Sequence, residues 1–214
     1  MTEVIIVDRG FEPYEQTHQA MKEKIAPLKG GQRAELWCVQ HPSVFTQGQA
    51  GKAEHVLKPG EIPIVQSDRG GQVTYHGPGQ VILYTLIPMK HFSLNVRELV
   101  NLLENTVIAL LESYGVPSQA RPDAPGVYVE GRKIASLGLR IRHGVSYHGA
   151  AMNVSMDLEP FSRINPCGYE GLQVTQLSDL ASNVVVDTVS DQLSQTFKEQ
   201  LLELASHRLA SQTQ

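Results

Sequence analysis

The sequence predicts an α+β fold in which a mixed, largely antiparallel sheet is packed with helices. Two observations lead to this prediction. Helical periodicity is clear at about 95–114 and 188–209, whereas residues 126–158 contain three successive β-type runs with no helix between them. Strands that follow one another in this way favour α+β architecture over a doubly wound parallel sheet. A chain of 214 residues is long enough for one full core, so we expect residues 1–214 to form a single domain.

The first part of the chain combines short strands with one helix. Residues 4–8 read as a strand, and the apolar stripe that begins at Phe11 predicts a helix that ends at Gly30 and Gly31. Further strands are predicted at 34–40, 61–65 and 80–88. A glycine-rich connection or hairpin joins the last two of these strands.

The middle of the chain holds the clearest helix and a meander. Helical spacing over 95–114 ends at Gly115, a residue typical of helix C-termini. The three β-type runs that follow are joined by two turn signals, at Glu130-Gly131 and His143-Gly144.

The last part of the chain is a loop followed by a helix. The loop at 161–173 is rich in glycine, proline and polar residues. Thr188 and Asp191 have the spacing of a capping box, which predicts that the final helix starts near Thr188. No internal repeat or low-complexity linker is present.

Composition argues against several function classes. Apolar residues make up 41% and charged residues 19%, as in globular proteins, and the formal net charge is −4. Few cations are therefore available to neutralise a phosphate backbone, and we expect no nucleic-acid partner. No apolar run has membrane-spanning length, and the apolar segment near the N-terminus, Val4 to Val7, is too short for a secretory leader. We expect no membrane partner and a cytoplasmic location.

The two cysteines, Cys38 and Cys167, differ in context. They match no common zinc spacing, so we expect no metal and two free thiols. Cys38 lies in a β-type run beside Trp37, which is typical of a small buried hydrophobe. Cys167 lies in a loop between proline and glycine, where it is either incidental or an exposed, oriented thiol. A nearby cation would lower the pKa of such a thiol and increase the nucleophilic thiolate.

The segment SDRGGQVTYHGPGQ, residues 67–80, exposes an unusual amount of backbone. It has neither the phosphate-loop pattern nor a dinucleotide-binding G-x-G-x-x-G that opens a helix. A tight turn is one explanation, because glycine accepts positive φ. The presence of Arg69, Thr74 and His76 around bare peptide groups favours another, a surface on which a carbonyl or an acyl chain could lie.

A lysine interrupts an apolar stripe in GRKIASLGLRIRHG, residues 131–144. In a regular strand Lys133 would share a face with Ala135 and the apolar residues at every second position after it, opposite the arginines at 132, 140 and 142. Burying an unpaired ammonium is expensive, so a buried Lys133 would suggest a purpose. The alternative is a bulge at Gly131 that turns the lysine to solvent.

The following strand combines small residues on one face. In VSYHGAAMNV, Gly149 and Ala151 leave room beside the backbone for an unbranched alkyl chain. Small residues beneath a packed helix would give the same pattern. His148 is expected to face the other way and to be structural.

Three segments in this order, DRGGQVTYHGPGQ, GRKIASLGLRIRHGVSYHGAAMNV and RINPCGYEG, resemble the lipoyl(octanoyl) transferases, over about Trp37 to Leu180. The resemblance implies the fold of biotin and lipoate protein ligase catalytic domains, with a core at about 31–209, and no cofactor. It also implies that an octanoyl group moves from octanoyl-acyl carrier protein to a lysine of lipoyl domains. The implied acceptors belong to 2-oxoacid dehydrogenases and the glycine cleavage H protein.

The resemblance implies roles for the matching residues. Cys167 would be the nucleophile that carries an acyl thioester, and Lys133 would lower the pKa of its thiol. Lys133 or His76 could take the proton of the attacking amine. The arginines at 132, 140 and 142 would contribute to a basic patch for the acidic carrier protein. The acyl group would bind to three short segments, which comprise Arg69, Gly70, Gly71, Gln72, Val73, Thr74, Tyr75, His76, Ser136, Leu137, Gly138, Gly149, Ala150 and Ala151.

Two other functions are compatible with such a pocket. A lipoate or biotin ligase of the same fold activates a free acid with ATP, but Cys167 and the absence of a ligase-like G-x-G-[KR]-x-R run favour the transferase. A non-catalytic module that binds acyl groups or carrier protein would need the same pocket without turnover.

Overall fold

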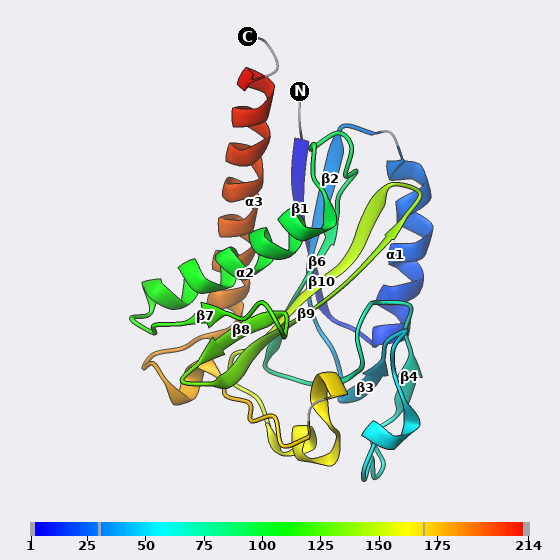
Figure 1. Ribbon diagram of the computed structural model, residues 1–214, viewed down its shortest axis with the longest axis vertical. Helices are drawn as coiled ribbons and strands as arrows, with labels where there is room; N and C mark the ends of the chain where they lie inside the picture. Colours follow the sequence, from blue (N-terminus) through cyan, green and yellow to red (C-terminus); the bar gives the residue numbers. More distant parts are fainter. Residues whose placement is uncertain (1–2, 30, 169, 212–214) are drawn as a thin grey trace.

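The computed structural model describes residues 3–29, 31–168 and 170–211, in which strands form two sheets (Figure 1). The larger sheet has the order β1-β2-β6-β10-β9-β8-β7, and only β1 and β2 within it are parallel. Its strands are β1 (Glu3–Phe11), β2 (Arg33–Gln40), β6 (Gln80–Leu86), β7 (Gln119–Ala120), β8 (Gly126–Val129), β9 (Arg132–Arg142) and β10 (Val145–Asn153). In the smaller sheet, β3 lies between a parallel and an antiparallel neighbour. Its strands are β3 (Val44–Gln47), β4 (Ile64–Gln66) and β5 (Val73–His76).

Helices cover both faces of the larger sheet (Figure 1). α1 (Tyr14–Leu28) packs on one face, and α2 (Val96–Ser113) and α3 (Val186–Ser211) pack on the other and against each other. The apolar side chains of the sheet therefore divide into two cores, a larger one under α2 and α3 and a smaller one under α1. In the described part of the chain, no helix combines the length and the apolar character needed to cross a membrane. The predicted α+β class, with a mixed and largely antiparallel sheet, is confirmed.

Local sequence explains where α2 begins and ends. The Asn95 side chain accepts a hydrogen bond from the Glu98 backbone at 3.0 Å, and the Glu98 carboxylate accepts one from the Asn95 backbone at 2.8 Å. This capping box satisfies two N–H groups that the first turn leaves without partners. Gly115, just beyond the helix, has a φ of +72°, a conformation that glycine adopts without strain. The predicted helix and its stop are confirmed.

The predicted meander is also confirmed. Glu130 and Gly131 have φ values of +50° and +79°, and His143 and Gly144 have +55° and +78°. Two successive left-handed residues form the hairpin turns that match the twist of the strands. These turns connect β8 to β9 and β9 to β10.

Three sequence predictions were wrong in detail. Phe11 is the last residue of β1 and is 58% exposed, because the helix starts only at Tyr14, after Pro13. α3 starts at Val186, so Thr188 lies inside its first turn and does not cap it. The glycine-rich segment is not only a connection, since it contains the buried strand β5. Four-residue strands such as β3 and β5 are too short to give a period of two.

Candidate active site

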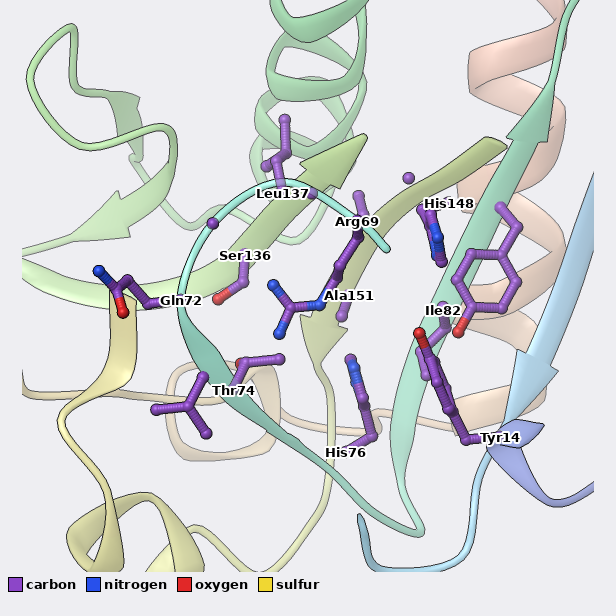
Figure 2. A pocket seen from close by; sticks show the side chains of 16 residues that line it. Tyr14, Arg69, Gln72, Thr74, His76, Ile82, Ser136, Leu137, His148 and Ala151 are labelled. Atoms are coloured by element: carbon purple, nitrogen blue, oxygen red, sulfur yellow. The ribbon is translucent and has the colours of Figure 1, made fainter. Parts of the chain in front are cut away.

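A pocket lies between the two sheets, and Tyr14, the first residue of α1, lines one end of it (Figure 2). Its cavity volume is about 50 Å³. All predicted acyl-binding residues except Gly70 and Tyr75 line it, together with four residues that the sequence did not indicate, Tyr14, Ile82, Tyr84 and His148. Figure 2 shows Gln72 at one end, Tyr14 and His148 at the other, and Arg69 between them. The binding roles of these residues stay predictions.

Gly70 and Tyr75 lie outside the lining for different reasons. Gly70 uses its backbone to hold the segment in place, since its N–H donates to Leu139 O at 2.9 Å. Tyr75 turns its ring away from the pocket, against Phe45 and Phe161. Successive side chains of a strand point to opposite faces, so Tyr75 lies on the face opposite Thr74 and His76, which line the pocket.

Arg69 fixes the glycine-rich segment to the smaller sheet. Its guanidinium is bonded to Thr46, through the hydroxyl at 3.0 and 3.2 Å and the carbonyl at 2.5 Å, and to Gly70 O at 2.9 Å. The aliphatic stem packs on Gly138, where an added Cβ would lie 3.1 Å from Arg69 Cδ. Arg69 therefore shapes the middle of the pocket as a rigid wall, and the lack of a side chain at Gly138 makes room for it.

His76 is held as a neutral imidazole. Its Nδ1 lies 2.7 Å from Gln80 Oε1, an acceptor, so Nδ1 carries the proton, and its Nε2 lies 3.2 Å from the Thr46 hydroxyl. Burial is the main cause that lowers the pKa of His76 to about 3. Because both ring nitrogens are bonded and the ring resists protonation, His76 is a poor candidate for taking the proton of an attacking amine.

Asp68 connects the glycine-rich segment to α1 and β10 at the far end of the pocket. Its carboxylate accepts hydrogen bonds from His18 of α1 at 2.8 Å, from His148 at 2.8 Å and from the Tyr147 hydroxyl at 2.6 Å. These hydrogen bonds outweigh the effect of burial and hold the pKa of Asp68 well below its usual range. Burial also lowers the pKa of His148 to about 4.

The same three residues, His18, Asp68 and His148, have the donor types and spacing of a possible metal site in the described part of the chain. Their geometry fits hydrogen bonding better. Both histidine Nε2 atoms lie 2.8 Å from one carboxylate oxygen, as N–H donors to a shared acceptor do. A metal-bound histidine normally donates its other nitrogen to an acceptor, yet Nδ1 of His148 has no partner among the described residues.

The prediction that His148 faces away from the small residues of β10 was wrong. His148 and Tyr147 are consecutive, so a regular strand would turn them to opposite faces. Instead both bond to the Asp68 carboxylate, and their ring centres lie 4.8 Å apart. The cause is a φ of +62° at His148, which interrupts the alternation of the strand. The next residue, Gly149, comes so close to β6 that an added Cβ would lie 2.0 Å from Leu83 O.

The far end of the pocket is closed by hydrogen-bonded aromatic side chains. The Tyr14 ring stacks on the His76 ring at 5.9 Å, and its hydroxyl lies 2.6 Å from the Ser67 hydroxyl. The Tyr84 hydroxyl lies 2.9 Å from His41 Nε2, whose ring is fixed by a bond from Nδ1 to Glu12 O at 2.7 Å. These hydrogen bonds and ring contacts hold the side chains at this end of the pocket in place.

Lys133 is buried, but not on the face that the sequence predicted. Only 2% of the residue is exposed, and its Nζ lies 5.5 Å from the centre of the Tyr128 ring. The register of β8 and β9 shifts between Val127, opposite Ala135, and Tyr128, opposite Lys133, so Ile134 is the extra residue of a β-bulge. One extra residue moves Lys133 from the face of Ala135 to the face of Ser136, which lines the pocket.

Gly126 creates the space for this lysine. An added Cβ there would lie 2.5 Å from Lys133 Cε and 3.1 Å from Nζ, and the φ of Gly126 is +139°. The backbone of Lys133 is tied to the segment after Cys167, since its N–H donates to Gln173 O and its carbonyl accepts from Thr175, both at 2.9 Å. Arg132 is paired with Glu130 at 3.0 Å.

Cys167 belongs to η3 (Pro166–Gly168), a single turn of 3-10 helix, but its side chain lies outside the described part of the structure. The neighbouring residues contact the pocket and the surrounding loops. Gly168 packs on the Gln72 side chain, which lines the pocket. One open groove on the outer side is bordered by Pro166, which precedes Cys167, and by Arg132, which precedes Lys133. Cys38, by contrast, is a buried free cysteine of β2, as predicted.

Comparison with known proteins identifies the family of this chain. Residues 14–198 match the model of the lipoyl protein ligase A/B catalytic domain. The chain belongs to this family. Within it, the chain is 60% identical to an octanoyltransferase of Pseudomonas entomophila, over 88% of this chain and 87% of the relative. It is 55% identical to an octanoyltransferase of Yersinia pestis, over 92% of this chain and 85% of the relative. The predicted resemblance and the acyltransferase activity are confirmed.

Solved structures of the lipoyl protein ligase A/B family and of biotin ligases show the same fold. A putative lipoate protein ligase from T. acidophilum with bound lipoic acid has a TM-score of 0.75 at 18% identity, covering 98% of this chain and 95% of that one. Biotin protein ligase from Aquifex aeolicus has a TM-score of 0.50 at 14% identity, covering 96% of this chain and 72% of that one. The predicted likeness to biotin and lipoate ligase catalytic domains is confirmed.

Proposed function

We propose that this chain transfers an octanoyl group from octanoyl-acyl carrier protein to a lysine amine of lipoyl domains, through a thioester on Cys167. The relatives named octanoyltransferases support the reaction class. A solved structure of a bipartite lipoate protein ligase and its E2 lipoyl domain, with a TM-score of 0.70, supports lipoyl domains as acceptors. The observation that carries the proposal is the mainly apolar pocket whose Gln72 end meets the η3 turn that contains Cys167.

The reaction needs two attacks on one carbonyl carbon. In the first, the Cys167 thiolate attacks the donor thioester, and the pantetheine thiolate leaves, so one thioester replaces another and no ATP is required. In the second, the neutral amine of the acceptor lysine attacks the Cys167 thioester, and the Cys167 thiolate leaves. An amide is more stable than a thioester, which drives the second step forward. The octanoyl chain would stay in the pocket throughout, which holds the carbonyl in place between the two attacks.

Lys133 would assist both steps. Its ammonium is buried on the face of β9 that lines the pocket, where a positive charge is weakly screened. An ammonium near the Cys167 thiol would lower the pKa of that thiol and favour the thiolate. In the second step a proton must leave the attacking amine, and Lys133 is a better candidate than His76 to relay it.

We also propose the setting and the partners of this reaction. The chain would act as one catalytic domain in the cytoplasm, without a cofactor, on acceptors of 2-oxoacid dehydrogenases and the glycine cleavage H protein. The exposed arginines Arg140 and Arg142, which extend along β9 beyond the pocket, would contribute to binding of the acidic carrier protein.

Multiple-turnover assays test the function. Purified protein is mixed with octanoyl-acyl carrier protein and a lipoyl domain, without ATP, and the mass of the lipoyl domain is followed. The proposal expects one octanoyl group on the acceptor, and none with Cys167→Ser. An ATP-dependent reaction from free octanoate that survives Cys167→Ser would instead identify a ligase. Binding of the octanoyl group without any transfer would identify a non-catalytic module.

A further inference from the structure

Gln72 occupies a distinctive position in the pocket. It lies at the end nearest η3, opposite the end closed by Tyr14 and His148 (Figure 2). The three heavy atoms closest to a Cβ built on Gly168 all belong to Gln72, namely Cγ at 3.3 Å and Cδ and Nε2 at 3.4 Å. Gly168 follows Cys167 directly, so the Gln72 amide packs beside the peptide group of the proposed nucleophile.

The oxygen of the Gln72 amide has no structural role among the described residues. Its Oε1 is buried and has no hydrogen-bond partner among the described residues. Most buried polar atoms in proteins are satisfied, because an unsatisfied one loses its hydration without replacement. A half-buried amide whose oxygen has no partner among the described residues, at the proposed reacting end of the pocket, is therefore available for a ligand. The two ends of an amide exchange by a rotation of the terminal torsion, so the group can present either N–H or C=O.

The backbone of Gln72 is anchored, which fixes the point from which its side chain extends. Gly48 N–H donates to Gln72 O at 3.3 Å, and Ala50 N–H donates to Gly71 O at 3.1 Å. Gly71, with a φ of +85°, makes the turn that leads into β5. A donor on an anchored backbone needs little reorganisation when charge develops on the substrate.

We propose that the side-chain amide of Gln72 donates a hydrogen bond to the carbonyl oxygen of the acyl thioester and is a catalytic residue. This inference rests on the proposed function. When the Cys167 thiolate forms its bond to the carbonyl carbon, the π electron pair of the C=O bond moves to oxygen. The N–H of Gln72 stabilises this oxyanion until the pair returns and the bond to the pantetheine sulfur breaks. The same contact serves the second step, when the acceptor amine attacks and the Cys167 sulfur leaves.

Two substitutions test this role. Gln72→Leu removes the donor, and Gln72→Glu keeps the shape and the packing on Gly168 while replacing the N–H donor by a carboxylate. Gln66→Leu is the matched control, because Gln66 is an exposed glutamine of β4 whose side chain bonds only to Gln47 among the described residues. Thermal unfolding checks that all three variants are folded.

Formation of the octanoyl-enzyme is measured in rapid-quench single turnovers with octanoyl-acyl carrier protein. Loss of one oxyanion donor typically slows the reaction by about 10²–10³-fold, so both Gln72 variants should fall by about this factor at saturating donor. The donor concentration for half-maximal rate should change much less, and Gln66→Leu should react like the wild type. A fall of less than about threefold in both Gln72 variants, or a loss confined to donor affinity, would overturn the proposal.

Infrared spectroscopy distinguishes a direct hydrogen bond from Gln72 to the acyl carbonyl from an indirect, positioning role of Gln72. The infrared stretch of a ¹³C-labelled acyl-enzyme carbonyl should lie at higher frequency in Gln72→Leu than in the wild type, because a hydrogen bond weakens the C=O bond. An unchanged frequency would rule out the contact. If the wild-type protein gains no octanoyl group, the proposed function is wrong. If the wild type reacts normally and the Gln72 variants are fully active, only the role of Gln72 is wrong.

Discussion

Lys133 lies over the face of Tyr128, with Nζ 5.5 Å from the ring centre, in a position that is 2% exposed. Two local features create this arrangement. The bulge at Ile134 turns the lysine toward the pocket face, and Gly126 leaves the space that the side chain fills. A buried cation is costly unless its surroundings use it, and the role that we propose for Lys133 is to favour the thiolate of Cys167.

Removing the charge of Lys133 should make Cys167 a weaker nucleophile. Lys133→Ala is expected to raise the apparent pKa for alkylation of Cys167 by iodoacetamide by about 1–3 units, because an adjacent positive charge no longer favours the thiolate. Peptide mapping identifies the modified cysteine, and Arg132→Ala serves as the control, since Arg132 is paired with Glu130. An alkylation profile that does not change in Lys133→Ala would remove Lys133 from the activating role.

Filling the pocket from β10 should shorten the preferred acyl chain. Ala151 lines the pocket and is 6% exposed, so Ala151→Leu would take the volume of about three carbon atoms from the ligand. Each methylene that loses its burial costs about 0.8 kcal/mol, or roughly fourfold. The ratio of kcat/KM for octanoyl over hexanoyl carrier protein should fall by at least tenfold. An equal loss for both donors would show that Ala151 does not contact the distal part of the chain.

Two buried histidines should make the protein less stable in mild acid. The pKa values of His76 and His148 are lowered to about 3 and about 4, so both are neutral in the folded protein where unfolded histidines, with a pKa near 6.5, take up protons. Their contribution is fully present above about pH 6.5 and is lost as the pH falls. Each can lower the free energy of unfolding by up to about 1.4 kcal/mol per pH unit below that point.

Urea denaturation at pH 7 and pH 5 measures this effect. The decrease in unfolding free energy from pH 7 to pH 5 should be smaller in His76→Gln than in the wild type. In His207→Gln, which removes an exposed histidine, the decrease should equal that of the wild type. Asp68 should not contribute within this range, because its depressed pKa means that its stabilisation is lost only below about pH 4. Equal stability of the wild type at the two pH values would contradict the prediction.

Gly149 should tolerate no side chain. A Cβ at this position would lie 2.0 Å from Leu83 O, so Gly149→Ala must push β10 and β6 apart. The expected loss is about 1–3 kcal/mol of unfolding free energy or more. Gly70→Ala is a suitable comparison, because the nearest atom to its added Cβ, Leu139 O, lies at 3.3 Å. Similar stabilities for the two variants would contradict the close approach of the strands.

The sequence predicted features that depend on local pattern. The helix that ends before Gly115, the meander turns and the small residues Gly149 and Ala151 all follow from residue type and spacing. Features that depend on local departures from regular geometry were missed. His148 reaches the pocket because of a positive φ, and Lys133 changes to the other face of β9 because of a bulge. Neither feature is visible in a period of two. Tyr14 lines the pocket from α1, an element that only the tertiary fold brings there.

The central claim is that Cys167 carries the octanoyl group as a thioester. The most direct measurement is the intact mass of the protein after brief mixing with octanoyl-acyl carrier protein without an acceptor, followed by peptide mapping. One octanoyl increment is expected, located on the peptide that contains Cys167, sensitive to hydroxylamine and absent from Cys167→Ser. An unmodified wild-type protein that still octanoylates lipoyl domains, or an increment that persists in Cys167→Ser, would contradict the claim.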